Sequence, residues 1–338
     1  MLQQHAGRAK CSLQGTPDVT EPRKHEKYDA LIYSCHALAS VRTVVAHPCD
    51  ETSLTGAVEA AAAKIIKPVL VGPETRIRAL AASLQLDISN LQIVDQPHSH
   101  AAAEKAVELV RAGEADALMK GSLHTDELMT EVVRKDVGIR TGRRVSHVFI
   151  MDVPTYPKPL FITDAAVNIF PTLEDKVDIV QNAIELAQAL RISLPKVAIL
   201  SALETISSKI PSTIDAAALC KMAERGQITG GVLDGPLALD NAISREAAAI
   251  KHINSPVAGD ADILLVPDLE AGNMLAKELS FLANADAAGI VLGARVPIIL
   301  TSRADNVRTR MASCAVAALY AHARRMAAAE IGKLAGDA

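Results

Sequence analysis

Two hydroxyl residues and an arginine, Thr301-Ser302-Arg303, form the most specific chemical pattern in the sequence. They follow a short apolar run, 298–300, that predicts a strand, and they precede an Ala-rich segment that predicts a helix. Backbone N–H groups at a helix start attract anions, and a guanidinium offers a planar fork for phosphate oxygens. The tripeptide therefore predicts a phosphate site. The alternative is that Ser302 or Asp305 caps the helix while Arg303 is solvated.

Polar groups follow other predicted strands in the same way. In open α/β sheets, ligands bind at the carboxyl ends of the strands. Each such residue taken singly is equally explained as a helix cap or a turn, so the repetition along both halves of the chain carries the prediction of a ligand site. The residues concerned are Lys120, Gly121, Ser122 and Thr125, then Thr163 and Asp164, then Asp234 and Asp240, then Asp268 and Asn273, and finally Thr301.

The order of the predicted elements indicates the fold class. Short β-branched runs alternate with helical stretches from Val41 onward, which predicts an α/β fold with parallel strands and right-handed crossovers. The alternation breaks between about Gly142 and Phe170, where only a Pro-rich turn separates two strands, so we expect an antiparallel hairpin and a change of domain there. The predicted strands are 43–46, 68–71, 91–94, 117–119, 147–151, 159–162, 197–200, 228–233, 263–266, 289–292 and 298–300.

Composition excludes several classes of protein. Lys and Arg number 35 and Asp and Glu 39, so the net charge is 35 − 39 = −4 and no global basic field for nucleic acid exists. No apolar run reaches the roughly 20 residues that a membrane helix needs. The five cysteines are widely spaced without a CxxC pair, which is typical of inert thiols in a reducing cytoplasm. Residues 1–28 lack the apolar region of a secretion signal and predict a flexible arm.

Common cofactor and nucleophile motifs are absent. The sequence has no GxGxxG after a strand, no GxxxxGK[ST] and no GxSxG, so it gives no support for a dinucleotide fingerprint, a P-loop or a nucleophile elbow. His98 and His100 have a spacing that suits a metal, but no carboxylate or Cys partner sits at a matching position. We read this pair as a loop and helix start, and we predict no metal site.

Several longer fragments together resemble the phosphate acetyltransferase and phosphate butyryltransferase family. The resemblance extends from about Val41 to Tyr320, and the fragments occur in the family's order. LMKG and GIRTG resemble the butyryl branch. The fragments are LMKGSLHTDEL (118–128), GIRTGRRVSHVF (138–149), ITDAAVNIFP (162–171), VLDGPLALDNAIS (232–244), SPVAGDADILLVPDLEAGNMLAKEL (255–279) and TSRADN (301–306).

The resemblance implies a reaction and an architecture. Acyl-CoA and inorganic phosphate would give acyl phosphate and CoA, reversibly, with a short acyl group from acetyl to butyryl. CoA and phosphate would be substrates, and no cofactor would be needed. The implied fold is α/β with two domains, similar to isocitrate and isopropylmalate dehydrogenases, with an active-site cleft between them. Domain one would be 30–142 plus 297–338. Domain two, 143–296, would form a cytoplasmic homodimer.

The resemblance also implies roles for individual residues. Ser302 would contact the CoA sulfur and Arg303 would hold phosphate, while Asp305 is the nearest carboxylate to act as the base. The acetyl branch carries an Asp farther into the next helix, but here 307–310 reads Val-Arg-Thr-Arg. The remaining expected substrate-binding residues are Gly121, Ser122, Thr125, Arg140, Ser146, Asp164, Asp234, Asp240, Asn273, Thr301, Arg308 and Arg310. Of these, Asp164, Asp234, Asp240 and Asn273 either line the cleft or brace the domains, and Arg308 and Arg310 either meet CoA phosphates or lie on the helix surface.

Two other functions stay open at this point. Because the helix acid is missing, the chain is alternatively an acyl-CoA-binding relative that has lost turnover. The second alternative is a metal- and NAD-dependent dehydrogenase of the same fold, for which Asp234, Asp240, Asp260 and Asp262 supply acids but no cofactor loop is seen.

Overall fold

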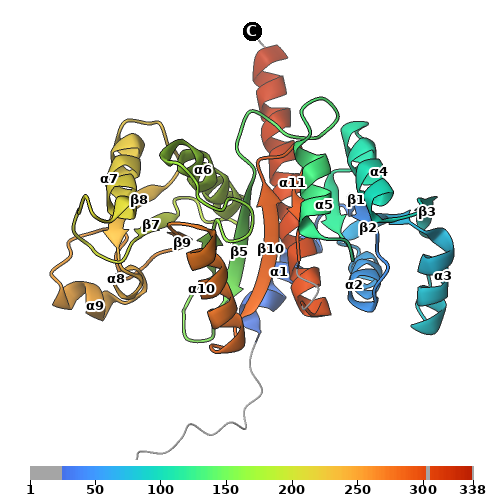
Figure 1. Ribbon diagram of the computed structural model, residues 1–338, viewed down its shortest axis with the longest axis horizontal. Helices are drawn as coiled ribbons and strands as arrows, with labels where there is room; N and C mark the ends of the chain where they lie inside the picture. Colours follow the sequence, from blue (N-terminus) through green and yellow to red (C-terminus); the bar gives the residue numbers. More distant parts are fainter. Residues whose placement is uncertain (1–24, 302–304, 337–338) are drawn as a thin grey trace, which may run out of the picture.

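A single mixed β-sheet organises the chain (Figure 1). The computed structural model describes residues 25–301 and 305–336. In this part of the chain the sheet has 11 strands in the order β3-β2-β1-β4-β11-β10-β5-β6-β9-β7-β8. The strands are β1 (Val41–Ala46), β2 (Ile66–Gly72), β3 (Gln92–Asp95), β4 (Ala117–Lys120), β5 (Ser146–Asp152), β6 (Leu160–Thr163), β7 (Lys196–Leu200), β8 (Val232–Leu237), β9 (Ile263–Leu265), β10 (Asp286–Leu292) and β11 (Ile298–Ile299).

The sheet consists of two parallel groups that run in opposite directions. Strands β3, β2, β1, β4 and β11 are parallel to one another, and so are β6, β9, β7 and β8. Between the groups lie β10 and β5, which pair with each other and with their outer neighbours in antiparallel fashion. The α/β expectation and the antiparallel hairpin of β5 and β6 are thereby confirmed.

The register brings the carboxyl ends of the two groups to the same level. Thr163, the last residue of β6, pairs with Val148, which pairs with Ile290, which pairs with Ile299 at the end of β11. These four residues form one row across the middle of the sheet. The loops that follow β6 and β11 therefore both begin beside the β5–β10 ladder.

Helices cover both faces of the sheet. One face packs against α1, α2, α3, α6, α7 and α11, and the other packs against α4 and α5 over one half and α8 and α10 over the other. In Figure 1 the β5–β10 ladder runs between α5 and α10. The helices are α1 (Glu26–Cys35), α2 (Glu51–Ala62), α3 (Glu74–Ser83), α4 (Ser99–Arg111), α5 (Thr125–Val133), α6 (Leu173–Ala189), α7 (Pro211–Glu224), α8 (Leu239–Ile243), α9 (Arg245–Ile250), α10 (Leu269–Phe281) and α11 (Val307–Gly336).

Local sequence signals explain several helix boundaries. Thr172 and Asp175 form a capping box, in which each side chain accepts a hydrogen bond from the other residue's backbone N–H at the start of α6. Gly113 ends α4 with a φ of +78°, a conformation that costs glycine little. His98 caps α4 by accepting from the Ala101 N–H, so this histidine takes part in the expected helix start.

Two boundaries differ from the sequence prediction. The predicted strand 228–233 lies four residues too early, because β8 spans Val232–Leu237 and includes Asp234. β8 is the outermost strand, where a proline such as Pro236 is tolerated because one side of the strand needs no ladder hydrogen bonds. The helix α1 begins at Glu26, inside the expected arm of residues 1–28, most of which lies outside the described residues.

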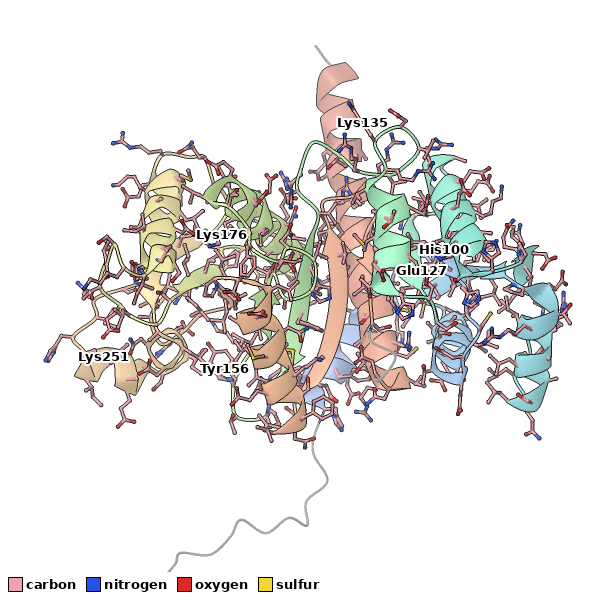
Figure 2. All side chains as sticks on the ribbon, in the orientation of Figure 1. His100, Glu127, Lys135, Tyr156, Lys176 and Lys251 are labelled. Carbon is pink, nitrogen blue, oxygen red and sulfur yellow. The ribbon has the colours of Figure 1, made fainter. Side chains whose placement is uncertain are left out.

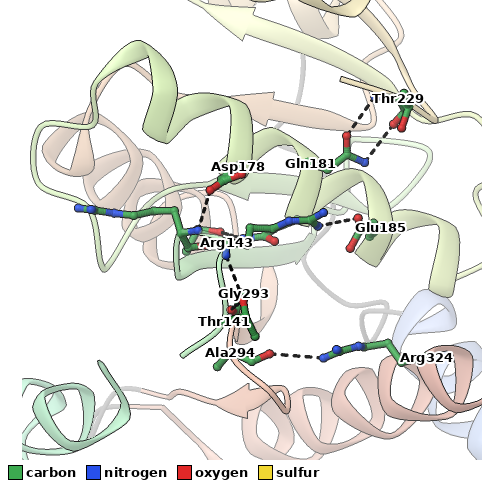
Figure 3. A network of polar contacts seen from close by, with 12 residues as sticks. Thr141, Arg143, Asp178, Gln181, Glu185, Thr229, Gly293, Ala294 and Arg324 are labelled. Atoms are coloured by element: carbon green, nitrogen blue, oxygen red, sulfur yellow. Dashed lines mark hydrogen bonds and ion pairs between the residues drawn. The ribbon is translucent and has the colours of Figure 1, made fainter. Parts of the chain in front are cut away.

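A polar network holds the segment that connects the two halves before β5 (Figure 3). Thr141 donates to the Gly293 carbonyl at 2.6 Å, and Arg143 pairs with Glu185 of α6 at 2.6 Å. The Arg144 N–H donates to Asp178 of the same helix at 2.7 Å. The end of β10 and the start of β5 are thus fixed to α6.

The described residues contain no helix that combines the length and apolar character needed to span a bilayer. Cys35, Cys49, Cys220 and Cys314 are free thiols, and Cys11 lies outside the described residues.

Candidate active site

The loops after β1 and β4 are joined at the carboxyl edge of the sheet. The N–H groups of Gly121 and Ser122 donate to the carbonyls of Ala46 and His47, both at 2.9 Å. A Cβ on Gly121 would lie 2.4 Å from both of these carbonyl oxygens, so only glycine fits. The Ser122 hydroxyl contacts His47 Nδ1 and the His47 carbonyl, both at 2.9 Å. The expected ligand residues Gly121 and Ser122 thus also build the loop itself.

The loop after β11 is held by a buried arginine. Arg310 in the first turn of α11 is fully buried and donates to the Thr301 hydroxyl at 2.6 Å and to the Thr52 hydroxyl of α2 at 3.3 Å. Burial lowers the pKa of Arg310, and the carboxylates of Asp50 and Asp305 oppose this shift. Gly56 of α2 provides the space, because a Cβ there would lie 2.9 Å from Arg310 Cδ.

The two arginines in the first turn of α11, Arg308 and Arg310, lie in different surroundings. Arg310 contacts Thr301 and α2, so of the two alternatives for this residue the one that places it on the helix surface is wrong. The Arg308 guanidinium lies 5.1 Å from the centre of the Tyr28 ring in α1. The two positions differ by about 200° around a helix, so they point in nearly opposite directions. Only Arg310 therefore contacts the strand ends. Asp305 is half-buried just before the helix.

Asp164 organises the loop that follows β6. It is buried, and its two oxygens accept hydrogen bonds from the N–H groups of Ala166, Val167 and Asn168 and from the Asn168 side chain. Asn273 of α10 donates to the neighbouring Ala165 carbonyl at 3.1 Å. Asn273 of α10 therefore lies beside the loop that contains Asp164, and this loop begins at the row shared with β11.

The other predicted residues have different surroundings. Thr125 is the first residue of α5, close in sequence to Ser122. Arg140 is exposed and forms an isolated bridge with Ala294. Ser146 is buried and accepts from the Asn182 side chain at 2.8 Å. Its hydroxyl thus braces β5 against α6.

Two predicted residues lie far from the joined loops. Asp234 lies inside β8, three strands beyond β6, and accepts from the Gly235 N–H at 2.9 Å. Asp240 in α8 pairs with Lys251 at 3.4 Å. In Figure 2, Lys251 lies near the left edge of the molecule, whereas Glu127 of α5 lies to the right of its centre. The structure thus does not bring Asp234 and Asp240 to the ends of β4 and β11.

Ser302 and Arg303 lie outside the described residues. The described parts of the chain contain no group of three or more His, Cys, Asp or Glu that could hold a metal ion. Asp260 and Asp262, which were considered as metal ligands, form ion pairs with Lys158 at 3.1 and 2.7 Å.

Sequence reasoning missed three residues of this region: His47, Thr52 and His147. His147 is fully buried in β5 beside the central row. The available signal was its position in an apolar strand, at a place whose neighbours two residues away, Val145 and Phe149, are both hydrophobic.

Comparison with known proteins decides the family. Residues 99–318 match the family model described as "Phosphate acetyl/butaryl transferase". The phosphate acetyltransferase of Rhizobium meliloti is 68% identical over 306 residues, which cover 90% of this chain and 97% of the relative. The chain belongs to the phosphate acetyl/butyryl transferase family.

Other members of the family are more distant. The phosphate butyryltransferase of Clostridium acetobutylicum is 42% identical, covering 88% of this chain and 98% of that protein. The crystal structure of a branched-chain phosphotransacylase from Enterococcus faecalis V583 superimposes with a TM-score of 0.73 at 32% identity, covering 83% of this chain and 99% of that one. The resemblance inferred from the sequence fragments is therefore confirmed.

Proposed function

We propose that this protein is a phosphate acyltransferase that moves a short acyl group, from acetyl to butyryl, between CoA and inorganic phosphate. A phosphate oxygen attacks the thioester carbonyl carbon, the C–S bond breaks, and its electron pair leaves with the CoA thiolate. The reverse reaction consumes acyl phosphate and CoA. The proposal rests on the family and on the row in which the carboxyl ends of β6 and β11 meet.

The same row supports the location of the site. We propose a groove between domain one (30–142 plus 297–338) and domain two (143–296), with the β5–β10 ladder as its floor. Loops from both groups of strands start there, so groups from either domain can act on one substrate. The hydrogen bond from Arg310 holds Thr301 at the end of β11, on the domain-one side of the proposed groove. Asp164 holds the loop after β6, on the domain-two side.

The catalytic assignments stay those that the family resemblance implies. Ser302 contacts the CoA sulfur, Arg303 holds phosphate and Asp305 is the proposed base. CoA and phosphate are both substrates, and the mechanism asks for no cofactor. An enzyme nucleophile is not required, because positioning and charge stabilisation suffice for direct attack by phosphate.

We also propose that the chain acts as a cytoplasmic homodimer through domain two. Large apolar side chains are exposed on this part of the chain, including Phe170 at 76% and Leu282 at 82%. Exposed apolar clusters are typical of protein interfaces. Sedimentation at several concentrations tests this, and a monomer at every concentration would contradict it.

One assay tests the activity. The loss of free CoA thiol is followed with acetyl, propionyl or butyryl phosphate, without nicotinamide and with a metal chelator present. We expect rapid thiol loss with at least one of these acyl phosphates. In Arg303→Ala the rate of thiol loss should no longer depend on the phosphate substrate as it does in the wild type. Binding of acyl-CoA without thiol loss would support the relative without turnover, which the lack of a carboxylate in 307–310 favours. Nicotinamide-dependent oxidation would support the dehydrogenase.

A further inference from the structure

An apolar cavity of about 350 Å³ lies on the sheet face that α1, α6 and α11 cover. Ile150 of β5 and Ala288 of β10, which pair across the central ladder, form part of its floor. Phe161 of β6 extends this floor, and Leu31 of α1 and Leu190 at the end of α6 line the sides. Cavities that hold small molecules begin at about 300 Å³ and have mostly apolar linings. Protein interiors otherwise contain few voids larger than a water molecule, so this space is large enough for a ligand.

The cavity lies away from the loops of the proposed active site. Asp152 at the end of β5 and Asp286 at the start of β10 line one side of the cavity. The proposed active site instead uses the loops that follow β6 and β11, which begin at the central row. Ile150 and Ala288 are two residues along the ladder from that row. Among the described residues, none of those predicted to bind substrate lines the cavity.

Four charged residues line the cavity, and three of them are paired. Lys27 pairs with Asp152 at 2.9 Å and donates to two backbone carbonyls, while Asp286 contacts His25 at 2.6 Å. Arg191, directly after α6, is exposed, and its side chain forms no hydrogen bond or ion pair within the part of the chain that the structure describes. Its exposure places it at the mouth of the cavity. The uncommitted charge at the mouth is therefore positive, and a guanidinium binds a carboxylate well.

We propose that this cavity binds an aliphatic monocarboxylate of medium chain length, with its alkyl chain over the β5–β10 ladder and its carboxylate at Arg191. The lining favours an alkyl chain, because burial there removes apolar surface from water. The charge at the mouth favours an anionic headgroup over an ammonium group, since Arg191 repels a second cation. The ligand is not a substrate at this place, because the cavity contains none of the residues assigned to phosphate or CoA. The inference goes beyond the proposed function and does not depend on it.

Calorimetric titration of the full chain with octanoate tests the proposal. We expect one octanoate per chain and a negative heat-capacity change, the signature of apolar burial. Butyrate should bind at least tenfold more weakly, because fewer CH₂ groups are buried, and octylamine should also bind at least tenfold more weakly. Saturating CoA and inorganic phosphate should change the affinity for octanoate by less than about threefold. Loss of octanoate binding in their presence would place octanoate in the substrate site and overturn the inference.

Two variants with matched controls locate the ligand. Ala288→Leu fills the cavity from its floor and should weaken octanoate binding at least tenfold, while its denaturation midpoint equals or exceeds that of the wild type. Its control is Ala82→Leu at an exposed position of α3, which should bind as the wild type does.

The second variant removes the charge at the mouth. Arg191→Asn suits the φ of +69° at this position and should weaken octanoate binding about threefold, as expected for an exposed ion pair. Its affinity for octanol should not change. The control is Arg225→Asn, at the end of α7, which should leave both affinities unchanged. Wild-type octanoate affinity in Arg191→Asn would overturn the assigned position of the carboxylate, even if Ala288→Leu proves too unstable to measure.

Other results would assign the cavity to a different occupant. The absence of saturable octanoate binding would overturn the inference. If a chain without residues 1–24 then binds octanoate, the cavity belongs to that segment of the chain. Dissociation of a dimer by octanoate in sedimentation would indicate that a second copy covers the cavity, which would also overturn the inference. Tighter binding of octylamine than of octanoate would contradict the assigned headgroup. None of these outcomes bears on thiol consumption, so the proposed activity is judged separately.

Discussion

Acidification should destabilise this protein through His147, and the size of the effect follows from its burial. The pKa of His147 lies near 4 in the folded chain, against an ordinary value of 6.5. Between these values the unfolded chain binds more protons than the folded chain, so stability falls as the pH falls. The contribution is fully present above the unfolded pKa and is lost on the way down to the folded pKa. From about pH 7 to about pH 5, linkage gives a loss of about 2 kcal/mol from this residue.

The assay is denaturant unfolding at both pH values for wild type and His147→Leu. Leucine has no proton to bind, so the variant should lose about 2 kcal/mol less between the two pH values than the wild type. Other groups titrate alike in both proteins and cancel in the difference. The pKa of Asp260, which the ammonium groups of Lys196 and Lys158 lower to about 2, affects stability only at lower pH. Equal pH-dependent losses in the two proteins would refute the assigned burial and charge state of His147.

Three further predictions concern the loops and their supports. Gly121→Ala should destabilise the protein by more than about 2 kcal/mol in urea unfolding, because the new Cβ would lie 2.4 Å from two carbonyl oxygens; a smaller change would show that the β1 and β4 loops separate easily. Arg310→Met should change the free energy of unfolding by less than about 2 kcal/mol, because an apolar side chain replaces a buried cation. The rate of thiol consumption should fall at least tenfold, because the contact with Thr301 is lost. Wild-type turnover in this variant would contradict the prediction. Lys196→Met should raise the pKa of Asp260 from about 2 toward its ordinary 3.8, as followed by NMR titration; an unmoved pKa would assign the shift to Lys158.

Local patterns predicted most of the sheet but not the level at which its two groups meet. Each strand forms its own short apolar run, so its position can be read from the residues. The row through Thr163, Val148 and Ile290 depends on the pairing of β5 with β10, in which Val148 and Ile290 are more than 100 residues apart, and no local signal specifies that register. Strand β8 was misplaced because Asp-Gly-Pro is typical of a turn, and only the position at the sheet edge permits a strand there.

The site was predicted in part, for similar reasons. Thr301, Gly121 and Asp164 follow strands, so the rule about carboxyl ends finds them. The different surroundings of Arg308 and Arg310 depend on how α11 is rotated against the sheet and on the space left by Gly56, about 250 residues earlier. His147 was missed because the complete burial of its ring is visible only once every neighbour has been placed.

The uninterrupted sheet has a mechanical consequence. Because β10 and β5 are hydrogen-bonded both to each other and to their outer neighbours, the two halves are joined by strands rather than by a flexible linker. Any widening of the space between α5 and α10 must therefore come from twisting or bending of this ladder. The amide protons of residues 146–152 and 286–292 are then the natural reporters of such a movement, since deformation of the ladder would alter their exchange with solvent.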